Sequence, residues 1–388
     1  MREGWKLKYL SEVCNELFAG GDVPKDRSSK YPTKEYNIPI YSNGATNDGL
    51  YGYTDIPRVT VNSITVSARG TIGFSVIRTE SYLPVVRLIV LIPNEELIIL
   101  PFLKYVIETM DFGNSGSSIP QLTVPMIKKY QSPIPPLQEQ QQIVAILDKA
   151  FKAIDQAKAN IEKNIENAKE LFQSKLNAIF SQKGAGWEEK TLGDVCEKTD
   201  NIKWQEHPNK TFEYIDLSSV CRESLSVTET TTVGEKNAPS RARKLINFGD
   251  EIFATTRPTL KRATIIDEEL SGQICSTGYV VLRPNKNISS EWIFFYLLTS
   301  NFMDRMESLQ RGASYPAVSD NDVKGSVLSI PLNKEDEKRN VIVMKGLREG
   351  TNDLVSRYQQ KLEFLDELKK SILQKAFAGE LTNKEVLV

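Results

Sequence analysis

Apolar and polar positions alternate along two stretches of the chain with the period of a long helix. Pro135-Pro136 precede the first stretch, and no Pro or Gly interrupts residues 138–181. Apolar residues recur there every seven positions in one row, Leu147, Ile154, Ile161 and Ala168, with a complementary row of Ala150, Ala157, Asn164 and Leu171. This repeat predicts a helix with a coiled-coil seam, in which Asn164 either fixes the register or faces water.

The second helical stretch closes the chain, over residues 334–388. Its rows are Leu347, Leu354 and Leu368 on one side and Tyr358, Leu365 and Ile372 on the other. At about 1.5 Å per residue each helix is roughly 55–65 Å long, more than the core of one domain can cover. Since each helix follows its own globular segment, we expect the two to pair antiparallel. The alternative is that each helix covers only its own domain.

The segments between the helices have a different pattern. Short β-branched runs broken by turn residues appear in "RVTVNSITVSARGTIGFSVI", in "KLINFGDEIFATTRP" and in "QICSTGYVVLRP". Such runs predict strands, and short helical patterns follow at "LPFLKYVIETM" and "SEWIFFYLLTSNFMDRM". The predicted fold class is therefore α+β.

The chain also repeats itself. "GWKLKYLSEVC" from Gly4 returns as "GWEEKTLGDVC" from Gly186. Further along, Gly116, Ser118 and Pro120 match Gly312, Ser314 and Pro316, Glu139 falls on Glu337, and the helix ends align Phe180 with Phe377. The repeat predicts two equivalent halves, with domains at 1–137 and 184–333 and long helices at 138–183 and 334–388.

Composition narrows the function classes. The 49 basic and 50 acidic side chains give a net charge of -1, and His207 is the only histidine. The sequence has no CxxC pair, no GxxxxGK[ST] phosphate loop, no GxGxxG dinucleotide loop and no apolar run of membrane-spanning length. We therefore expect no metal site and no catalysis by this chain alone. Four separated cysteines and the lack of a signal-peptide pattern favour the cytoplasm.

Three features occur together: the duplicated Gly-Trp entries, the "IPPLQEQQQIVAILD" opening of the first helix and the closing "KKSILQKAFAGEL". In this combination the chain resembles the specificity (S) subunit of bacterial and archaeal type I restriction-modification systems. "IPIYSNGATNDGLYGYTD", "VSARGTIGFSVI" and "CSTGYVVLRP" also resemble its target-recognition domains. The second helix opening, "NKEDEKRNVI", departs from the family's Pro-Leu-acid-Gln phrase.

The resemblance implies a fold and a mechanism. Two strand-rich α/β target-recognition domains, related by a pseudo-two-fold repeat, each read half of a split site in double-stranded DNA, and the paired antiparallel helices act as the spacer. Two methyltransferase (modification) subunits dock on the S subunit, and restriction/translocase subunits join them. S-adenosylmethionine, ATP and Mg would then be bound by those partners, and this chain would bind no cofactor and no membrane.

A near-neutral chain needs local basic groups to bind DNA, since cationic contacts with phosphates supply much of the affinity. The Arg side chain can form bidentate hydrogen bonds with guanine, and Asn or Gln can do so with adenine. Any single Arg, however, more commonly contacts a phosphate or a surface carboxylate. Two loops match in the repeat, one with Ser117, Ser118 and Gln121 and the other with Ser314 and Tyr315. The alternative is that these loops are ordinary polar surface turns. The candidate DNA contacts are Lys25, Arg27, Lys30, Asn43, Arg69, Thr71, Ser117, Ser118, Gln121, Arg241, Arg243, Arg257, Thr259, Lys261, Arg262, Ser314 and Tyr315.

Other classes of protein remain open at this point. One is an enzyme that fuses target domains to a methyltransferase or nuclease, although the required loops and carboxylate clusters are missing. Another is a structural coiled-coil scaffold with paired ligand-binding heads. A third is the target-recognition subunit of another restriction-modification type. Genes for a methyltransferase and a translocase beside this one would favour the S subunit.

Overall fold

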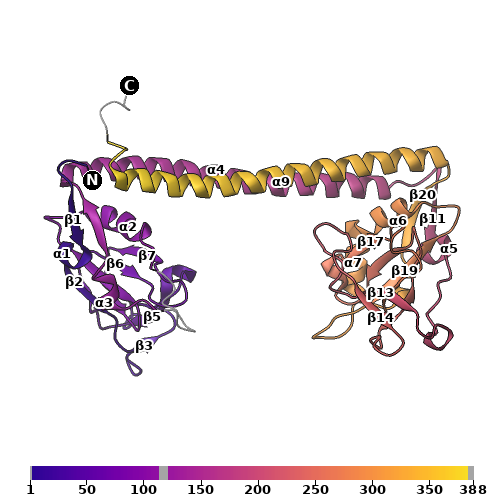
Figure 1. Cartoon of the computed structure of the whole chain (residues 1–388), viewed down its shortest axis with the longest axis horizontal. Coiled ribbons are helices and arrows are strands. Elements are labelled where there is room, and N and C mark those ends of the chain that lie inside the picture. The colour runs from indigo at the N-terminus through magenta and orange to yellow at the C-terminus, as the bar shows by residue number, and fades with distance from the viewer. Residues whose placement is uncertain (1, 113–120, 383–388) are drawn as a thin grey trace. The chain divides into compact units, whose positions relative to one another are not determined.

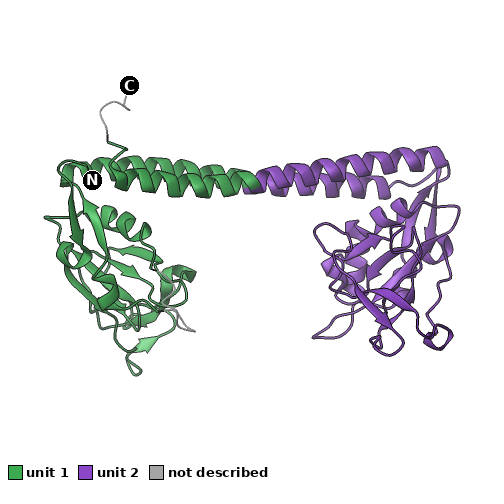
Figure 2. Ribbon diagram, in the orientation of Figure 1, with its two compact units in different colours: residues 1–161, 360–388 green, residues 162–359 purple. Residues whose placement is uncertain are grey.

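The computed structural model describes residues 2–112 and 121–382, which form two compact units. Unit 1 comprises residues 1–161 and 360–388, and unit 2 comprises residues 162–359 (Figures 1 and 2). Each unit therefore combines one globular segment with parts of two long helices. These are α4 (Leu137–Phe180) and α9 (Lys334–Ala378).

Unit 1 contains two four-stranded sheets. The first has the order β2 (Cys14–Ala19), β9 (Ile89–Pro93), β6 (Ser63–Val66) and β7 (Ser75–Arg78). The second has the order β3 (Ser28–Ser29), β5 (Leu50–Thr54), β4 (Ile38–Tyr41) and β8 (Leu83–Pro84). A ribbon of β1 (Lys6–Tyr9) and β10 (Gln131–Ile134) leads into α4. The shorter helices are α1 (Leu10–Val13), η1 (Thr46–Gly49), α2 (Leu100–Glu108) and α3 (Val124–Ile127).

Unit 2 is built in the same way. Its first sheet has the order β12 (Cys196–Glu197), β19 (Tyr279–Pro284), β16 (Glu251–Ala254) and β17 (Ala263–Ile265). Its second has β14 (Thr231–Gly234), β13 (Thr211–Ile215), β18 (Ile274–Ser276) and β15 (Ala242–Leu245). The ribbon is β11 (Trp187–Thr191) with β20 (Val327–Pro331). The helices are α5 (Leu192–Val195), η2 (Trp204–Glu206), η3 (Pro258–Leu260), α6 (Ser290–Leu297), α7 (Ser300–Leu309) and α8 (Asp320–Lys324).

The internal repeat extends through the segments whose sequences differ. The first sheets share one strand order, and β6 pairs with β9 antiparallel as β16 pairs with β19. The second sheets share a parallel pair, β4 with β8 and β13 with β18, but their fourth strands differ. In unit 1 that strand, β3, pairs with β5; in unit 2 it is β15, which pairs with β18. The two halves thus share a scaffold, and their additional strands lie at opposite edges of the second sheet.

The long helices run antiparallel within each unit, as predicted. In unit 1, Lys158 of α4 forms an ion pair with Asp366 of α9, and Asp155 lies 4.0 Å from Lys369. The start of α4 packs into the same core as the end of α9, through buried Leu147. Leu373 and Ala376 are the buried α9 residues of that core.

Unit 2 uses the opposite ends of the same two helices. Phe180 at the end of α4 lies 4.7 Å, between ring centroids, from Trp292 of α6. Val341 and Met344 near the start of α9 belong to the same core. Each core therefore contains the beginning of one long helix and the end of the other.

The seam differs from the predicted one at three positions. Leu147 and Ile154 are buried and Ile161 is half-buried, but Leu171 is 57% exposed, and Leu354 and Leu368 are 40% and 47% exposed. Their assignment to the seam is wrong. An α-helix turns once in 3.6 residues and so drifts from a seven-residue row, which brings the next residues, Phe172, Val355 and Lys369, inward instead. Asn164 faces water. Leu347, Tyr358, Leu365 and Ile372 are half-buried, as a seam requires.

One buried polar contact appears at the start of both long helices. Gln140 is fully buried, and its side-chain Oε1 accepts a hydrogen bond from the backbone N–H of Ile99, which precedes α2, at 2.9 Å. In unit 2 the buried Glu337 accepts from the N–H of Ser289, which precedes α6, at 2.7 Å. Glu337 thus corresponds to Gln140 rather than to Glu139, one residue away from the alignment that the sequence suggested. Satisfying an N–H at a helix start joins α2 and α6 to the long helices.

Among the described residues, none of the helices has the length and apolar content required to span a bilayer. Within the same ranges, no group of three or more His, Cys, Asp or Glu side chains is arranged to hold a metal ion.

Glu251 on β16 is the most unusual titratable group of unit 2. Its side chain is fully buried, and neither carboxyl oxygen has a hydrogen-bond partner. Burial raises the pKa of this carboxyl well above its usual range, and the negative charges of Asp250 and Glu291 raise it further. The folded protein therefore holds Glu251 as the neutral acid at pH values at which the unfolded chain would ionise it.

We expect Glu251→Gln to increase the free energy of unfolding of the protein at neutral pH. A raised pKa in the folded state stabilises the protein fully only below the unfolded-state pKa, and that contribution is lost as the pH rises toward the folded-state value. The advantage of the variant should therefore grow by about 1.4 kcal/mol per pH unit above roughly pH 4.5, up to the folded-state pKa. Urea unfolding of both proteins across a pH series measures it, with exposed Glu197→Gln as the control. A difference that does not change with pH would contradict this assignment.

Candidate nucleic-acid interface

Two loops of unit 2 are joined at the end of strand β16. The turn at residues 255–262 follows that strand, and the loop at residues 310–318 runs beside it. The carbonyl of Thr255 accepts a hydrogen bond from Val318 N–H at 2.9 Å, and Arg257 N–H donates to the carbonyl of Pro316 at 2.7 Å. The structure thus brings together the basic turn and the Ser314–Tyr315 loop, two sets of candidates that are separated in the sequence.

Arg257 and Tyr315 form the centre of this surface. The guanidinium carbon of Arg257 lies 4.7 Å from the Tyr315 ring centroid, and its Nη2 donates to the carbonyl of Ser314 at 3.4 Å. Arg257 is exposed, and 69% of Tyr315 is exposed. Among the described residues, no carboxylate forms an ion pair with Arg257. A stacked and unneutralised guanidinium is suited to a phosphate or to the O6 and N7 atoms of guanine.

The backbone of the turn is held in an uncommon conformation. Arg257 (φ 51°) and Lys261 (φ 54°) are both left-handed and flank η3. Such a conformation costs a non-glycine residue about 1–2 kcal/mol, and strain of this kind often marks binding sites. The hydrogen bond from Arg257 to Pro316 helps to hold it.

The remaining candidates of unit 2 fall into two groups. Thr259 and Lys261 are exposed in the turn itself. Arg262 instead donates to the carbonyl of Leu217, so its guanidinium joins two loops of the protein. Arg241 and Arg243 lie at the start of β15 and are exposed, and Nε of Arg243 donates to the carbonyl of Ser240 at 3.1 Å.

The corresponding surface of unit 1 follows from the repeat. The carbonyl of Ala68 accepts from Leu122 N–H at 2.9 Å, as that of Thr255 accepts from Val318. Gly70, with φ 76°, therefore takes the place of Arg257, and Arg69 precedes it. Arg69 and Thr71 are exposed. Arg69 is thus an exposed cation adjacent in the sequence to the equivalent position.

Asn43 and Gln121 both lie beside this loop. The side-chain Oδ1 of Asn43 accepts a hydrogen bond from Ala68 N–H at 2.7 Å, so Asn43 positions the loop. Gln121 accepts a hydrogen bond from Arg87, an exposed residue that is not among the candidates named from the sequence. Its isolation in the apolar run "LPVVRLIVLI" is the feature that could have identified it. Ser117 and Ser118 lie outside the described residues.

The other basic candidates of unit 1 flank β3. Arg27 forms an ion pair with Asp55, and its hydrogen bonds hold the pKa of that carboxyl below the usual range. Lys30 lies 5.7 Å from the ring centroid of Tyr31, and Lys25 is exposed. Of these three, Arg27 is the one whose charge the protein already neutralises.

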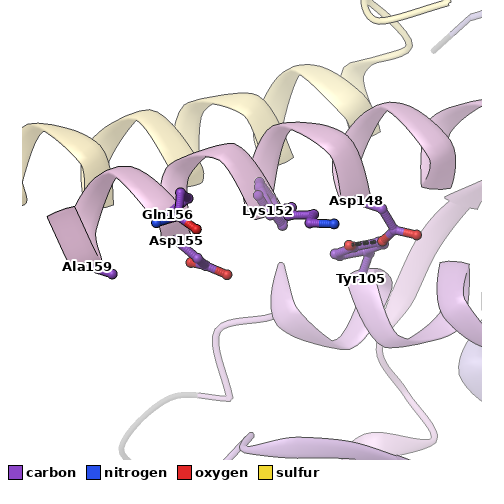
Figure 3. A pocket seen from close by; sticks show the side chains of 7 residues that line it. Tyr105, Asp148, Lys152, Asp155, Gln156 and Ala159 are labelled. Carbon is purple, nitrogen blue, oxygen red and sulfur yellow. Dashed lines mark hydrogen bonds between the residues drawn. The ribbon is translucent and has the colours of Figure 1, made fainter.

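A groove between α2 and α4 differs in character from these loops. It encloses about 610 Å³, and Asp148, Lys152 and Asp155 line it, with the hydroxyl of Tyr105 donating to Asp148 at 2.5 Å (Figure 3). Two carboxylates against one ammonium make it unsuitable for a phosphate. The similarly placed cavity of unit 2, beside α6, encloses about 390 Å³ and carries Lys345 in place of Asp148. The two units therefore differ in charge here, and their shared features lie at the loops.

The model of the type I restriction modification DNA specificity domain matches residues 2–167 and 184–364. A putative type I specificity subunit of Mycoplasma pneumoniae, S.MpnORF507P, is 38% identical over 178 residues, which cover 46% of this chain and 48% of that protein. The HindI specificity subunit of Haemophilus influenzae is 28% identical over 156 residues, which cover 39% and 33%. The chain spans about half the length, or less, of these curated relatives.

Solved structures agree with the fold. A chain from a study of the assembly and conformational transition of a type I restriction-modification system superposes with a TM-score of 0.77 at 17% identity, covering 98% of this chain and 99% of that one. The HsdS subunit of Thermoanaerobacter tengcongensis superposes with a TM-score of 0.59 at 18% identity, covering 98% of each chain.

We expect Arg257→Gln to weaken binding of duplex DNA more than Arg27→Gln does. Arg257 is free of carboxylates, whereas Arg27 is paired with Asp55, so only the first loss removes an available cation. If Arg257 contacts a phosphate, the slope of log K against log salt should decrease by about 0.9; if it contacts a base, the variant should lose about 1–3 kcal/mol on its specific site. Fluorescence anisotropy across a salt series measures both effects. Equal effects of the two substitutions would count against this surface.

Proposed function

The chain belongs to the family of type I restriction modification DNA specificity domains, and we propose that it selects the DNA sequence on which a restriction-modification complex acts. Each unit reads one half of a bipartite site in double-stranded DNA. The observation that carries the proposal is the pairing of loops at the end of β6 and of β16. One backbone contact, from Leu122 N–H to the carbonyl of Ala68 and from Val318 N–H to that of Thr255, recurs there with different side chains around it.

Two domains that recognise different base sequences need this combination of a shared scaffold and different side chains at the ends of its loops. Base edges are distinguished by the side chains that reach them, whereas phosphate contacts position the protein. Arg257 with Tyr315 in unit 2, and Arg69 with Arg87 and Gln121 in unit 1, are the residues that we assign to these tips. The basic groups are local, which agrees with a net charge of only -1.

The chemistry of the complex is assigned to other subunits. Two methyltransferase subunits carry S-adenosylmethionine, and restriction/translocase subunits use ATP and Mg to move and cut DNA. This chain would supply recognition and docking surfaces and would bind none of these cofactors. The proposed place of action is the cytoplasm, where bacterial DNA is accessible. The helix pair would set the gap between the half-sites.

Exchanging about residues 20–120 for those of a relative with another specificity should change one half of the methylated motif. The other half and the gap should persist, because unit 2 and both long helices keep their sequence. Sequencing of methylated adenines in cells that carry the complete system measures the motif, with the mirror exchange in unit 2 as the control. A change in both halves from one exchange would contradict the assignment of one half-site to each unit.

Lengthening both helices tests their role as the spacer. Four residues inserted after Lys158, and four before Asp366, preserve this ion pair and the helix register on its unit 1 side. Four residues add about 6 Å of helix, and B-DNA rises about 3.4 Å per base pair, so we expect the same half-sites with a gap about two base pairs longer. Methylated-base sequencing again measures the motif, and insertion in one helix alone is the control. Full methylation at the original gap would show that the helices do not set it.

A further inference from the structure

The turn η1 of unit 1, between β4 and β5, has an uncommon backbone. Its residues Asn47 and Asp48 are both left-handed, with φ 48° and 53°. Single Asn or Asp residues adopt this conformation at little cost, but two in succession are uncommon in a chain of L-residues. Gly49 follows with φ 79°, and a Cβ at that position would lie 2.4 Å from the carbonyl oxygen of Ser42. The shape of the turn is therefore fixed by packing, against local preference.

Two hydrogen bonds tie this segment to the loop that follows β6. The backbone N–H of Gly44 donates to the hydroxyl oxygen of Ser67 at 3.1 Å. The side chain of Asn43 accepts from Ala68 N–H at 2.7 Å. The segment therefore lies against the loop that presents Arg69, one of the residues assigned above to the DNA-facing tip of unit 1.

A buried arginine also holds the turn. Arg78, at the end of β7, is only 4% exposed, and its guanidinium carbon lies 3.4 Å from the ring centroid of Tyr41. Its Nε donates to the hydroxyl of Thr65 at 3.2 Å, and its Nη2 donates to the carbonyl of Asp48. Within the described part of the chain, no carboxylate forms an ion pair with it. Burying a cation without a counter-ion is costly, so its presence here indicates that the position of the turn matters.

The side chains of the turn suit base edges rather than phosphates. Asn47 and Asp48 are exposed, and segment 42–49 contains no Lys or Arg. In the ranges that the structure describes, no hydrogen bond or ion pair engages either side chain. Phosphates repel a carboxylate, whereas an amide can pair with N6 and N7 of adenine and a carboxylate can accept from N4 of cytosine. The turn thus has the chemistry of base recognition without that of phosphate binding.

We propose that Asn47 is a specificity-determining residue of unit 1, whose amide pairs with an adenine of its half-site, and that Arg78 is the positioning residue of its turn. This inference rests on the proposed function, which supplies the DNA. Unit 2 has a comparable arrangement in the segment after β13, the counterpart of β4. There Arg262, just before β17, donates to the carbonyl of Leu217. In both units an arginine beside the edge strand of the first sheet holds a loop of the second sheet.

Deleting the amide while keeping the backbone tests the assignment. Glycine adopts φ 48° without strain, so Asn47→Gly removes the side chain alone. The full chain, assembled with the modification subunits of its own system, is assayed for methylation of duplexes that carry its motif. In a matched set of duplexes, one base pair of the unit 1 half is replaced at a time. We expect the variant to lose about 5- to 150-fold of its discrimination at one A·T pair and to keep it at every other position.

Asn209→Gly is the matched control, because Asn209 is an exposed, left-handed asparagine (φ 66°) in the turn before β13 of unit 2. It should keep the discrimination of the wild type at every pair. Arg78→Met, which removes the donors at similar volume, should relax the same pair as Asn47→Gly. The variant that combines both should relax that pair no further than Asn47→Gly alone, because Arg78 acts through the turn.

The outcomes separate the possible failures. Unchanged discrimination in Asn47→Gly, or an equal loss of rate on all duplexes, would overturn the role of Asn47 and leave the proposed function in place. Relaxation at a different pair in Arg78→Met would overturn the positioning role. A wild-type complex that methylates all duplexes at one rate would overturn the proposed function as well.

Discussion

The whole molecule depends on the burial of one apolar stripe along each long helix. A helix of this length needs a continuous cover, and neither globular segment can supply it alone. The stripe of α4 begins in the core of unit 1 at Ile143 and ends in that of unit 2 at Phe180, while the stripe of α9 begins in unit 2 at Val341 and ends in unit 1 at Ala376. Each core is therefore completed by the far end of the helix that starts in the other unit. Full burial of a large side chain such as Phe180 contributes about 1.5–3 kcal/mol, so this exchange stabilises both units.

The existence and antiparallel sense of the helices could be predicted, because uninterrupted apolar periodicity is a local property of the sequence. The seam could be located only in part. Leu171 and Leu368 follow a seven-residue row and are typical seam residues, yet they point outward, because the helical period moves Phe172 and Lys369 into their place. The contribution of residues near 376 to the core of unit 1 could not be predicted, since contacts across more than 200 positions leave no local pattern.

The candidate site shows the same division. The repeat pointed to the loop of Ser314 and Tyr315, and composition pointed to the turn around Arg257, but their contact through Pro316 is a tertiary one. Tertiary contacts also decide which candidates bind to other parts of the protein and are therefore less available to DNA. Arg27 is neutralised by a carboxylate 28 positions away, and Asn43 is bound to the backbone of another loop. Residue type identified groups able to touch DNA, and only the fold distinguishes those that are available.

The repeat also shows which features the two units share and which differ between them. The residue with left-handed backbone after β6 is Gly70, which adopts φ 76° without strain. After β16 it is Arg257, whose side chain makes the same backbone region unfavourable. The unit 2 loop tolerates that cost because the Pro316 carbonyl holds the backbone and Tyr315 covers the guanidinium. A scaffold whose strand order and loop contacts are fixed can therefore accept different side chains at one point. Divergent loop tips on one scaffold are thus a consequence of one duplicated fold whose two units, in the proposed function, read different halves of a DNA site.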